Sequence, residues 1–282
     1  MRFQPRNLYG LFLCLLLYTG LTAQPTPSNS SPAATLPTVF LVGDSTVKNG
    51  SGDGANKQWG WGEPLVMYFD AAKITVLNRA RGGRSSRTYQ TEGLWEEVLA
   101  AMKPGDFVLI QFGHNDGGAL NDASRARGTI KGLGEESEEI DNLLTKKHEV
   151  VHSYGWYLRK YVADTQAKGA TPILCSPVPR KIWKEGKIAR DQYGAWAAAI
   201  AKETKVAFLD LNEIIARQYE ALGVEKVEAL FADEHTHTSW EGAELNAAVV
   251  IAGLKALLPN RLSVFFSPQT ESIKAAPLRT TK

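Results

Sequence analysis

Residues 38–46 read TVFLVGDST, an apolar run with β-branched side chains that stops at a glycine and continues into polar residues. A short apolar run without polar alternation is typical of a strand that is buried on both faces. Gly43 marks the end of that strand, because glycine interrupts strands. Asp44 and Ser45 are therefore expected just beyond the end of a buried strand, at the rim of a sheet.

Four more apolar runs of the same character follow along the chain. They cover residues 74–78, 107–112, 171–176 and 206–210. Helical patterns alternate with these runs. They cover residues 94–102, 153–168, 192–204 and 212–222. This alternation predicts an α/β fold with a parallel sheet that helices cover on both faces.

Glycine-bearing polar turns directly follow the first three predicted strands. They are residues 43–45 (GDS), residues 81–85 (RGGRS) and residues 113–116 (GHND). In sheets of this kind the reactive groups gather at the carboxyl ends of the strands. The sequence therefore predicts one functional site that is built from these three turns.

The N-terminus has the pattern of an export signal. Arg2 and Arg6 precede an apolar stretch at residues 8–21, and Ala23 ends a suitable cleavage site. The apolar stretch is shorter than the roughly 20 residues that a spanning helix needs. We expect a signal peptide at residues 1–23 and an exported protein; the alternative is a membrane anchor that stays attached.

The rest of the chain is expected to form one domain with a disposable segment at each end. Residues 24–37 are rich in Pro, Ser and Thr, which predicts a flexible leader. No change of composition marks a linker within residues 38–260, the expected domain. The tail, residues 261–282, is expected to be disordered unless Val264–Phe266 docks on the domain.

The polar insert at residues 117–150 is predicted to be a long loop that either borders the site or is simply solvated.

Composition excludes several classes of partner. The chain has a formal charge of +2, and removal of Arg2 and Arg6 with the signal brings this to about zero. Such a balance provides no electrostatic attraction for nucleic acid, or for a membrane once the signal is removed.

Cys14 leaves with the signal, so we expect no intrachain disulfide and a buried Cys175 thiol. Nothing in the sequence specifies an oligomeric state.

Ser45 is a candidate nucleophile. A serine hydroxyl becomes nucleophilic only when a base takes its proton and hydrogen-bond donors stabilise the oxyanion. A Gly-Asp-Ser triplet alone also occurs in ordinary turns, where Asp and Ser bond their own backbone. The G-x-S-x-G elbow of α/β-hydrolases is absent, because residue 47 is a valine.

The stretch DEHTHT at residues 233–238 contains a candidate base. His235 and His237 are two residues apart, a spacing that puts both on one face of a strand and suggests a zinc pair. No third ligand is nearby in the sequence, so we expect no metal and no cofactor. The other interpretation is a base, His237, with Glu234 as the carboxylate that orients it.

Thr238 and Glu241 have the spacing of a capping box, which predicts a helix from there to Leu254 and a rigidly held loop before it.

Asn115 and Gly83 are candidates for an oxyanion hole. The Asn115 side chain offers an N–H, and a residue without Cβ lets its own backbone N–H approach a ligand closely. Each residue alone is equally well explained as part of a turn. The functional interpretation is favoured because these two, Ser45 and His237 come in order and at strand ends.

Five stretches of the sequence together resemble those of a known family. The stretches that carry the resemblance are GDSTVKNG, GWGEP, GGRSSRTY, FGHNDGG and HTHTSWEGAE, which run in this order between Val39 and Leu258. They resemble the blocks of SGNH/GDSL hydrolases and most closely those of the rhamnogalacturonan acetylesterases. The resemblance implies a three-layer α/β/α sandwich around a five-stranded parallel sheet, which is a flavodoxin-like arrangement.

Carried over by position, the resemblance implies a serine esterase. It implies Ser45 as nucleophile and His237 as general base. It also implies an oxyanion hole made of the backbone N–H groups of Ser45 and Gly83 and the side chain of Asn115. The family usually has Asp three residues before the histidine, where this chain has Glu234. We expect Glu234 to orient the imidazole, with Asp233 as the alternative.

The implied substrate is the O-acetylated rhamnogalacturonan of pectin, an acetylated plant cell-wall polysaccharide. Candidates to bind its galacturonate carboxylates or stack on its sugars are Arg84, Arg87, Arg180, Lys181 and Trp183. Two alternatives stay within esterases, namely a deacetylase of xylan or another glycan, and a lipolytic enzyme or thioesterase. An inactive carbohydrate-binding protein is a third, which retention of the candidate site residues disfavours.

Overall fold

The structure, a computed structural model, describes Met1, residues 35–50 and residues 54–277. The predicted signal peptide at residues 1–23 lies outside the described residues except for Met1, and so does almost all of the predicted leader. Residues 36–277 belong to one compact unit.

Five parallel strands form the central sheet, in the order β2-β1-β3-β6-β9. They are β1 (Thr38–Gly43), β2 (Thr75–Asn78), β3 (Phe107–Gln111), β6 (Thr171–Cys175) and β9 (Ala207–Leu209). Each corresponds to one predicted run, so the predicted α/β fold with a five-stranded parallel sheet is confirmed. β2 and β9 begin one residue later than the predicted runs, and β3, β6 and β9 end one residue earlier.

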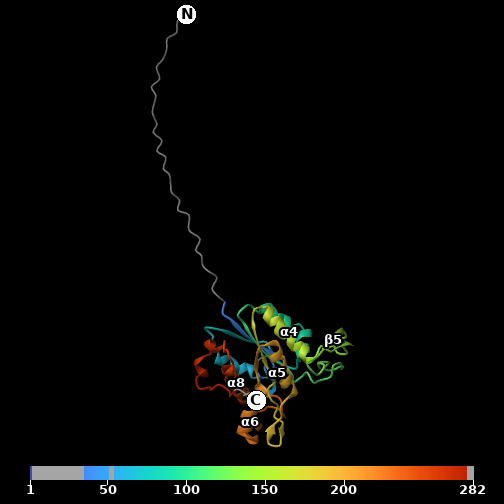
Figure 1. The fold of residues 1–282 in the computed structure, drawn as a ribbon, viewed down its shortest axis with the longest axis vertical. Coiled ribbons are helices and arrows are strands. Elements are labelled where there is room, and N and C mark those ends of the chain that lie inside the picture. The colour runs from blue at the N-terminus through green and yellow to red at the C-terminus, as the bar shows by residue number, and fades with distance from the viewer. Residues whose placement is uncertain (2–34, 51–53, 278–282) are drawn as a thin grey trace. The chain divides into compact units, whose positions relative to one another are not determined.

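Both faces of the sheet are buried because successive side chains of a strand point to opposite sides. In β1, Val39 and Leu41 join one hydrophobic core, whereas Phe40 and Val42 join the other. The first core is closed by α1 (Gly62–Leu65), α6 (Leu211–Leu222), α7 (Val224–Glu228) and α8 (Trp240–Ala256). The second is closed by α2 (Ser86–Thr91), α3 (Leu94–Ala101), α4 (Tyr154–Ala167) and α5 (Gln192–Thr204). The result is a three-layer sandwich, and Figure 1 labels four of these helices around the sheet.

The shorter elements lie in the connections and in the C-terminal tail. They are η1 (Ala55–Lys57), η2 (Val66–Tyr68), η3 (Ser263–Phe265), η4 (Pro268–Thr270), and the hairpin strands β7 (Trp183–Lys184) and β8 (Lys187–Ile188).

The insert contains regular structure that the sequence did not predict. β4 (Ser137–Asp141) pairs antiparallel with β5 (His148–His152), and this hairpin lies beside the start of α4 (Figure 1). The expected long loop is therefore wrong for these residues. The hairpin strands are mostly polar and exposed, so they lack the continuous apolar pattern that reveals the central strands.

The described part of the tail is docked on the domain, and the expectation of disorder is wrong there. Phe266 packs on Phe69 with ring centroids 5.5 Å apart, and the N–H of Ala276 donates to the carbonyl of Ala252 at 2.8 Å. Residues 278–282 lie outside the described residues. The docking buries apolar side chains against the first core, which compensates for ordering the segment.

Helix α8 begins one residue later than the capping-box pattern predicts. Ser239 is its N-cap and accepts a hydrogen bond from the N–H of Gly242 at 3.3 Å. The Thr238 hydroxyl donates instead to the carbonyl of Trp59 at 2.8 Å, which ties the loop before α8 to another part of the domain. In the described residues, no helix has the length and apolar character needed to cross a membrane.

Candidate active site

Ser45 lies at the carboxyl edge of the sheet, in a tight turn that follows β1. The carbonyl of Asp44 accepts hydrogen bonds from the N–H groups of Val47 and Lys48, both at 3.1 Å. Gly43 is required here, because a Cβ at this position would stand 2.6 Å from the carbonyl oxygen of Gln111 on the neighbouring strand. The turn therefore lifts the Ser45 side chain off the end of the strand.

The hydroxyl of Ser45 contacts His237, which comes from the loop before α8. The distance from Ser45 Oγ to His237 Nε2 is 2.8 Å. The other ring nitrogen, Nδ1, lies 2.5 Å from Oδ2 of Asp233. Hydroxyl, imidazole and carboxylate thus form a continuous relay, the arrangement that activates a serine nucleophile.

Asp233, and not Glu234, is the carboxylate that contacts the imidazole, so the preference for Glu234 is corrected. Oδ1 of Asp233 accepts hydrogen bonds from the N–H groups of His235, Thr236 and His237, at 3.1, 2.7 and 2.9 Å. These bonds close a turn that aims Oδ2 at the ring, whereas Glu234 is exposed. Burial alone would raise the pKa of Asp233. The hydrogen bonds from His237 and Thr236 outweigh it and leave that pKa below its ordinary value.

Gly83 and Asn115 each offer a hydrogen-bond donor of the kind that an oxyanion hole uses. Gly83 has φ = +79°, a backbone conformation that favours glycine. Within the described part of the chain, the backbone N–H groups of Ser45 and Gly83 donate to no acceptor. One N–H of the Asn115 side chain donates to the carbonyl of Arg84 at 2.9 Å, which holds the amide in place and leaves its second N–H free.

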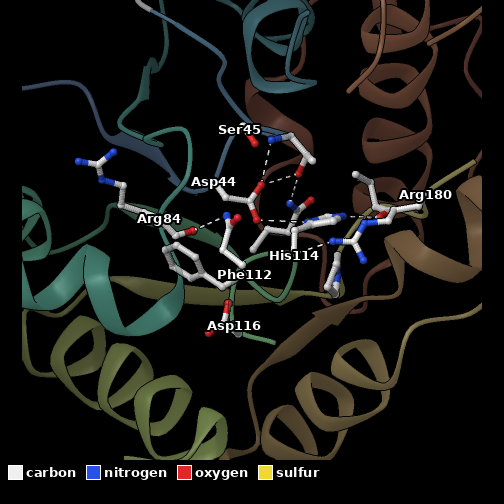
Figure 2. Close-up of polar contacts among 12 residues, drawn as sticks. Asp44, Ser45, Arg84, Phe112, His114, Asp116 and Arg180 are labelled. Carbon is white, nitrogen blue, oxygen red and sulfur yellow. Dashed lines mark hydrogen bonds and ion pairs between the residues drawn. The ribbon is translucent and has the colours of Figure 1, made fainter. Parts of the chain in front are cut away.

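A buried pair, Asp44 and His114, supports the nucleophile turn from below (Figure 2). Oδ2 of Asp44 lies 3.2 Å from Nδ1 of His114, and Nε2 of His114 lies 2.9 Å from the carbonyl of Val178. Both ring nitrogens face acceptors, so the ring satisfies both contacts only as an imidazolium. Burial acts to raise the pKa of Asp44. The charge and hydrogen bond of His114, with the hydrogen bonds from Thr46, hold that pKa below its ordinary value.

Asp116, at the end of the turn after β3, connects this turn to the start of α2 by hydrogen bonds. Its Oδ1 accepts hydrogen bonds from the N–H of Ser86 at 3.0 Å and from the Ser86 hydroxyl at 2.5 Å. Its Oδ2 is buried without a hydrogen-bond partner. Burial raises the pKa of Asp116 to about 7.

Arg87 is not a substrate-binding residue, contrary to the expectation. Its side chain is 0% exposed and both Nε and Nη2 lie 2.6 Å from the carboxylate of Glu149 on β5. Nη1 donates to the carbonyls of Leu120 and Gly128. All of these contacts are to residues of the insert, so the guanidinium holds the insert against α2.

Two other predicted substrate-binding residues, Arg84 and Arg180, differ in where their side chains lie. The guanidinium of Arg84 points away from Ser45 and pairs with Glu92 at 2.8 Å (Figure 2). Arg180 lies beside His114, and its Nη2 donates to the His114 carbonyl at 3.0 Å.

Lys181 and Trp183 are both partly buried and contact other parts of the domain. Lys181 pairs with Glu228 at 2.6 Å with its side chain 6% exposed. Trp183 packs on the first core, and its indole N–H is buried without a partner.

His235 does not join His237 in a metal site. Its Nδ1 lies 2.5 Å from the hydroxyl of Thr236. Among the described residues, no group of three or more His, Cys, Asp or Glu side chains is arranged to hold a metal ion. Cys175 is free and buried, as predicted, and burial raises the pKa of its thiol.

Two features of the site escaped sequence reasoning. The Asp44–His114 pair joins side chains from different turns, and only the pairing of β1 with β3 brings them together. Arg127, in the insert, donates to the carbonyl of Gly83 at 3.0 Å. The one available signal was that His114 sits in a turn already suspected of function.

Comparison with known proteins agrees with this geometry. Residues 41–245 match the GDSL-like Lipase/Acylhydrolase family. The chain is 30% identical over 230 residues to the rhamnogalacturonan acetylesterase of Emericella nidulans, covering 79% of this chain and 89% of that protein. It is 33% identical over 226 residues to YesY of Bacillus subtilis, described as a probable rhamnogalacturonan acetylesterase, covering 78% of this chain and 93% of that protein.

A solved structure has a similar fold. The crystal structure of YxiM from Bacillus subtilis superposes with a TM-score of 0.63 and 27% sequence identity. The match covers 78% of this chain and 56% of that chain, so the present chain spans about half of YxiM.

Proposed function

This chain belongs to the GDSL-like lipase/acylhydrolase family and is a carboxylic ester hydrolase, and from that premise we propose that it removes O-acetyl groups from the rhamnogalacturonan of pectin. We propose Ser45 as its nucleophile, His237 as general base and Asp233 as the carboxylate that orients the base. The single observation that carries the proposal is the relay of contacts, 2.8 Å from Ser45 to His237 and 2.5 Å from His237 to Asp233.

In the first half of the reaction, the Ser45 hydroxyl attacks the acetyl carbonyl while Nε2 of His237 takes its proton. Negative charge then develops on the carbonyl oxygen. We assign the N–H groups of Ser45 and Gly83 and the second N–H of Asn115 as the donors to that oxygen, because none of them donates to another acceptor among the described residues. The imidazolium, stabilised by Asp233, returns its proton to the departing sugar oxygen.

In the second half, water attacks the acetyl group on Ser45 while His237 takes a proton from the water. The same donors stabilise the second oxyanion. Acetate leaves as Ser45 recovers its proton from His237. Asp233 stays ionised throughout, which agrees with its lowered pKa.

The pectic substrate is supported by the names of the two relatives and is tested by acetate release. Acetylated rhamnogalacturonan and acetylated xylan are compared as substrates, with Ser45→Ala as the inactive control. We expect release from the pectic polymer and its loss in the variant. Release from xylan alone would leave the mechanism intact and remove the pectic assignment. Release only from lipid esters would replace the glycan substrate altogether.

We also propose that the protein is exported, on the pattern of residues 1–23 described above. The test is to produce the full chain in a secreting host and to sequence the N-terminus of the protein found outside the cytoplasm. A mature N-terminus at Gln24 is the expected result. A protein that keeps Met1 and sediments with membranes would identify the segment as an anchor instead.

A further inference from the structure

A groove of about 900 Å³ opens beside Gly83. Its walls are the loop after β2, the helix α2, and the insert with its β4–β5 hairpin. A volume near the upper end of ordinary ligand pockets leaves room for a segment of a polymer. The lining residues that matter here are Arg84, Arg125, Arg127, Lys147 and Glu149.

Three charged residues of the groove are already neutralised within the protein. Arg84 lies 2.8 Å from the carboxylate of Glu92, which also lines the groove. Glu149 receives the buried guanidinium of Arg87 at 2.6 Å, and the side-chain N–H of Asn142 at 2.8 Å. These contacts leave neither carboxylate as a free counter-charge for other cations of the groove.

Three cations of the groove form no salt bridge among the described residues. Arg125, Arg127 and Lys147 have no carboxylate partner in the part of the chain that the structure describes. Burial and the nearby charge of Arg125 lower the pKa of Arg127, and the charges of Asp44, Asp116 and Asp122 only partly offset them. Cations that are held close together without a carboxylate in direct contact favour the binding of an anion.

This cationic wall is tied to the candidate oxyanion hole. Nη1 of Arg127 donates to the carbonyl of Gly83 at 3.0 Å, while the N–H of Gly83 is free. The cations of the groove therefore adjoin the turn that carries Gly83. The insert thus supplies a charged surface that begins at the reaction centre.

We propose that this groove binds the carboxylates of uronic acid units that flank the acetylated sugar, so that Arg125, Arg127 and Lys147 select an acidic polysaccharide. The inference rests on the proposed function and adds the residues that set its substrate class. Guanidinium groups match carboxylates in geometry and charge. The whole chain has a formal charge of only +2, so attraction for an acidic polymer has to come from a local cluster such as this one.

The test replaces Arg125 and Lys147 together by Gln, since neither contacts Gly83. The measured quantity is the ratio of kcat/KM on acetylated rhamnogalacturonan to kcat/KM on the same polymer with its carboxylates methyl-esterified. We expect this ratio to fall about tenfold in the double variant at low salt, because an exposed ion pair contributes up to about fivefold. The difference from the wild type should shrink as salt screens the charges.

Arg261→Gln is the matched control. Arg261 is exposed and lies near Phe107 and Thr171, the first residues of β3 and β6, at the opposite edge of the sheet from Ser45. Its removal changes the net charge of the protein without touching the groove, so the ratio should stay at the wild-type value. An equal fall of the ratio in the control and in the double variant would overturn the proposal, and so would an unchanged ratio in both.

A binding measurement separates this inference from the proposed function. Calorimetry follows an oligogalacturonate binding to the Ser45→Ala protein, with and without the Arg125→Gln and Lys147→Gln changes. Loss of binding only with the two changes supports the groove even if acetate release shows a different acetyl ester to be the substrate. Equal binding in both proteins, or none in either, overturns the groove while leaving the esterase mechanism standing.

Discussion

Oδ2 of Asp233 lies 2.5 Å from Nδ1 of His237, on the side of the ring away from Ser45. The carboxylate therefore selects the tautomer in which Nδ1 carries the proton, and this leaves Nε2 free to accept the proton of Ser45. Its other oxygen is held by three backbone N–H groups, so the loop that carries the base also fixes the orientation of that base.

Asp233→Asn is expected to lower kcat by about 100-fold or more with little change in KM, because the amide still accepts the backbone hydrogen bonds but no longer holds the imidazolium. Glu234→Gln, one residue along the chain and exposed, is the matched control and should stay within about twofold of the wild type. Steady-state hydrolysis of an acetyl ester measures both. A larger loss in Glu234→Gln than in Asp233→Asn would return the role to Glu234.

The Asp44–His114 pair should behave as one unit in unfolding. His114→Gln is expected to lower the free energy of unfolding by about 3 kcal/mol, since it leaves the carboxylate of Asp44 buried without its cation. The double change with Asp44→Asn should cost less than the sum of the two single changes, by about 1 kcal/mol or more. Urea unfolding of the four proteins provides the comparison, and strictly additive losses would show that the two side chains are not coupled.

Arg87→Lys separates a structural role from a substrate contact. We expect a loss of about 3 kcal/mol in the free energy of unfolding, because Lys cannot replace the two contacts to Glu149 and the two carbonyl contacts at once. Arg84→Lys, at a half-exposed pair, should cost less than about 1 kcal/mol. Denaturant unfolding measures both variants. A higher KM for Arg87→Lys with unchanged stability would instead make Arg87 a substrate ligand.

Asp116 makes folding stability depend on pH. Its pKa is raised from 3.8 to about 7 in the folded protein, so across that window the folded state holds a proton that the unfolded chain releases. Stability from this group is present at low pH and is lost as pH rises, with a slope of about 1.4 kcal/mol per pH unit at most. Asp116→Asn should remove this slope, so that the variant gains stability relative to the wild type between pH 4 and pH 7.

Asp122→Asn is the control for this measurement. The hydrogen bonds from the N–H groups of Arg125 and Ser124 lower the pKa of Asp122, so its effect on stability lies below the same window. Urea unfolding at several pH values should show the wild-type slope in this variant. The role given to Asp116 would be wrong if both variants kept that slope.

Much of the fold could be predicted because its signals are local. The runs that became β1, β3 and β6 are apolar along most of their length, with polar residues only at their ends, and a strand buried on both faces requires that pattern. Local signals also identified Ser45 and His237 as candidates, since each stands in a polar stretch at the end of an element. The polar β4–β5 hairpin has no such pattern and went unrecognised, because what orders it is its contact with α2 and α4.

The sequence by itself therefore determined the layered sheet, the edge at which the site lies, and the serine and histidine that meet there. The tertiary structure alone decided which of two adjacent carboxylates faces His237, because a turn of backbone hydrogen bonds aims Asp233 and leaves Glu234 in solvent. It also decided that Arg87 is buried while Arg125 is free. Burial and charge pairing depend on which distant segments pack together, and no spacing along a single chain encodes that.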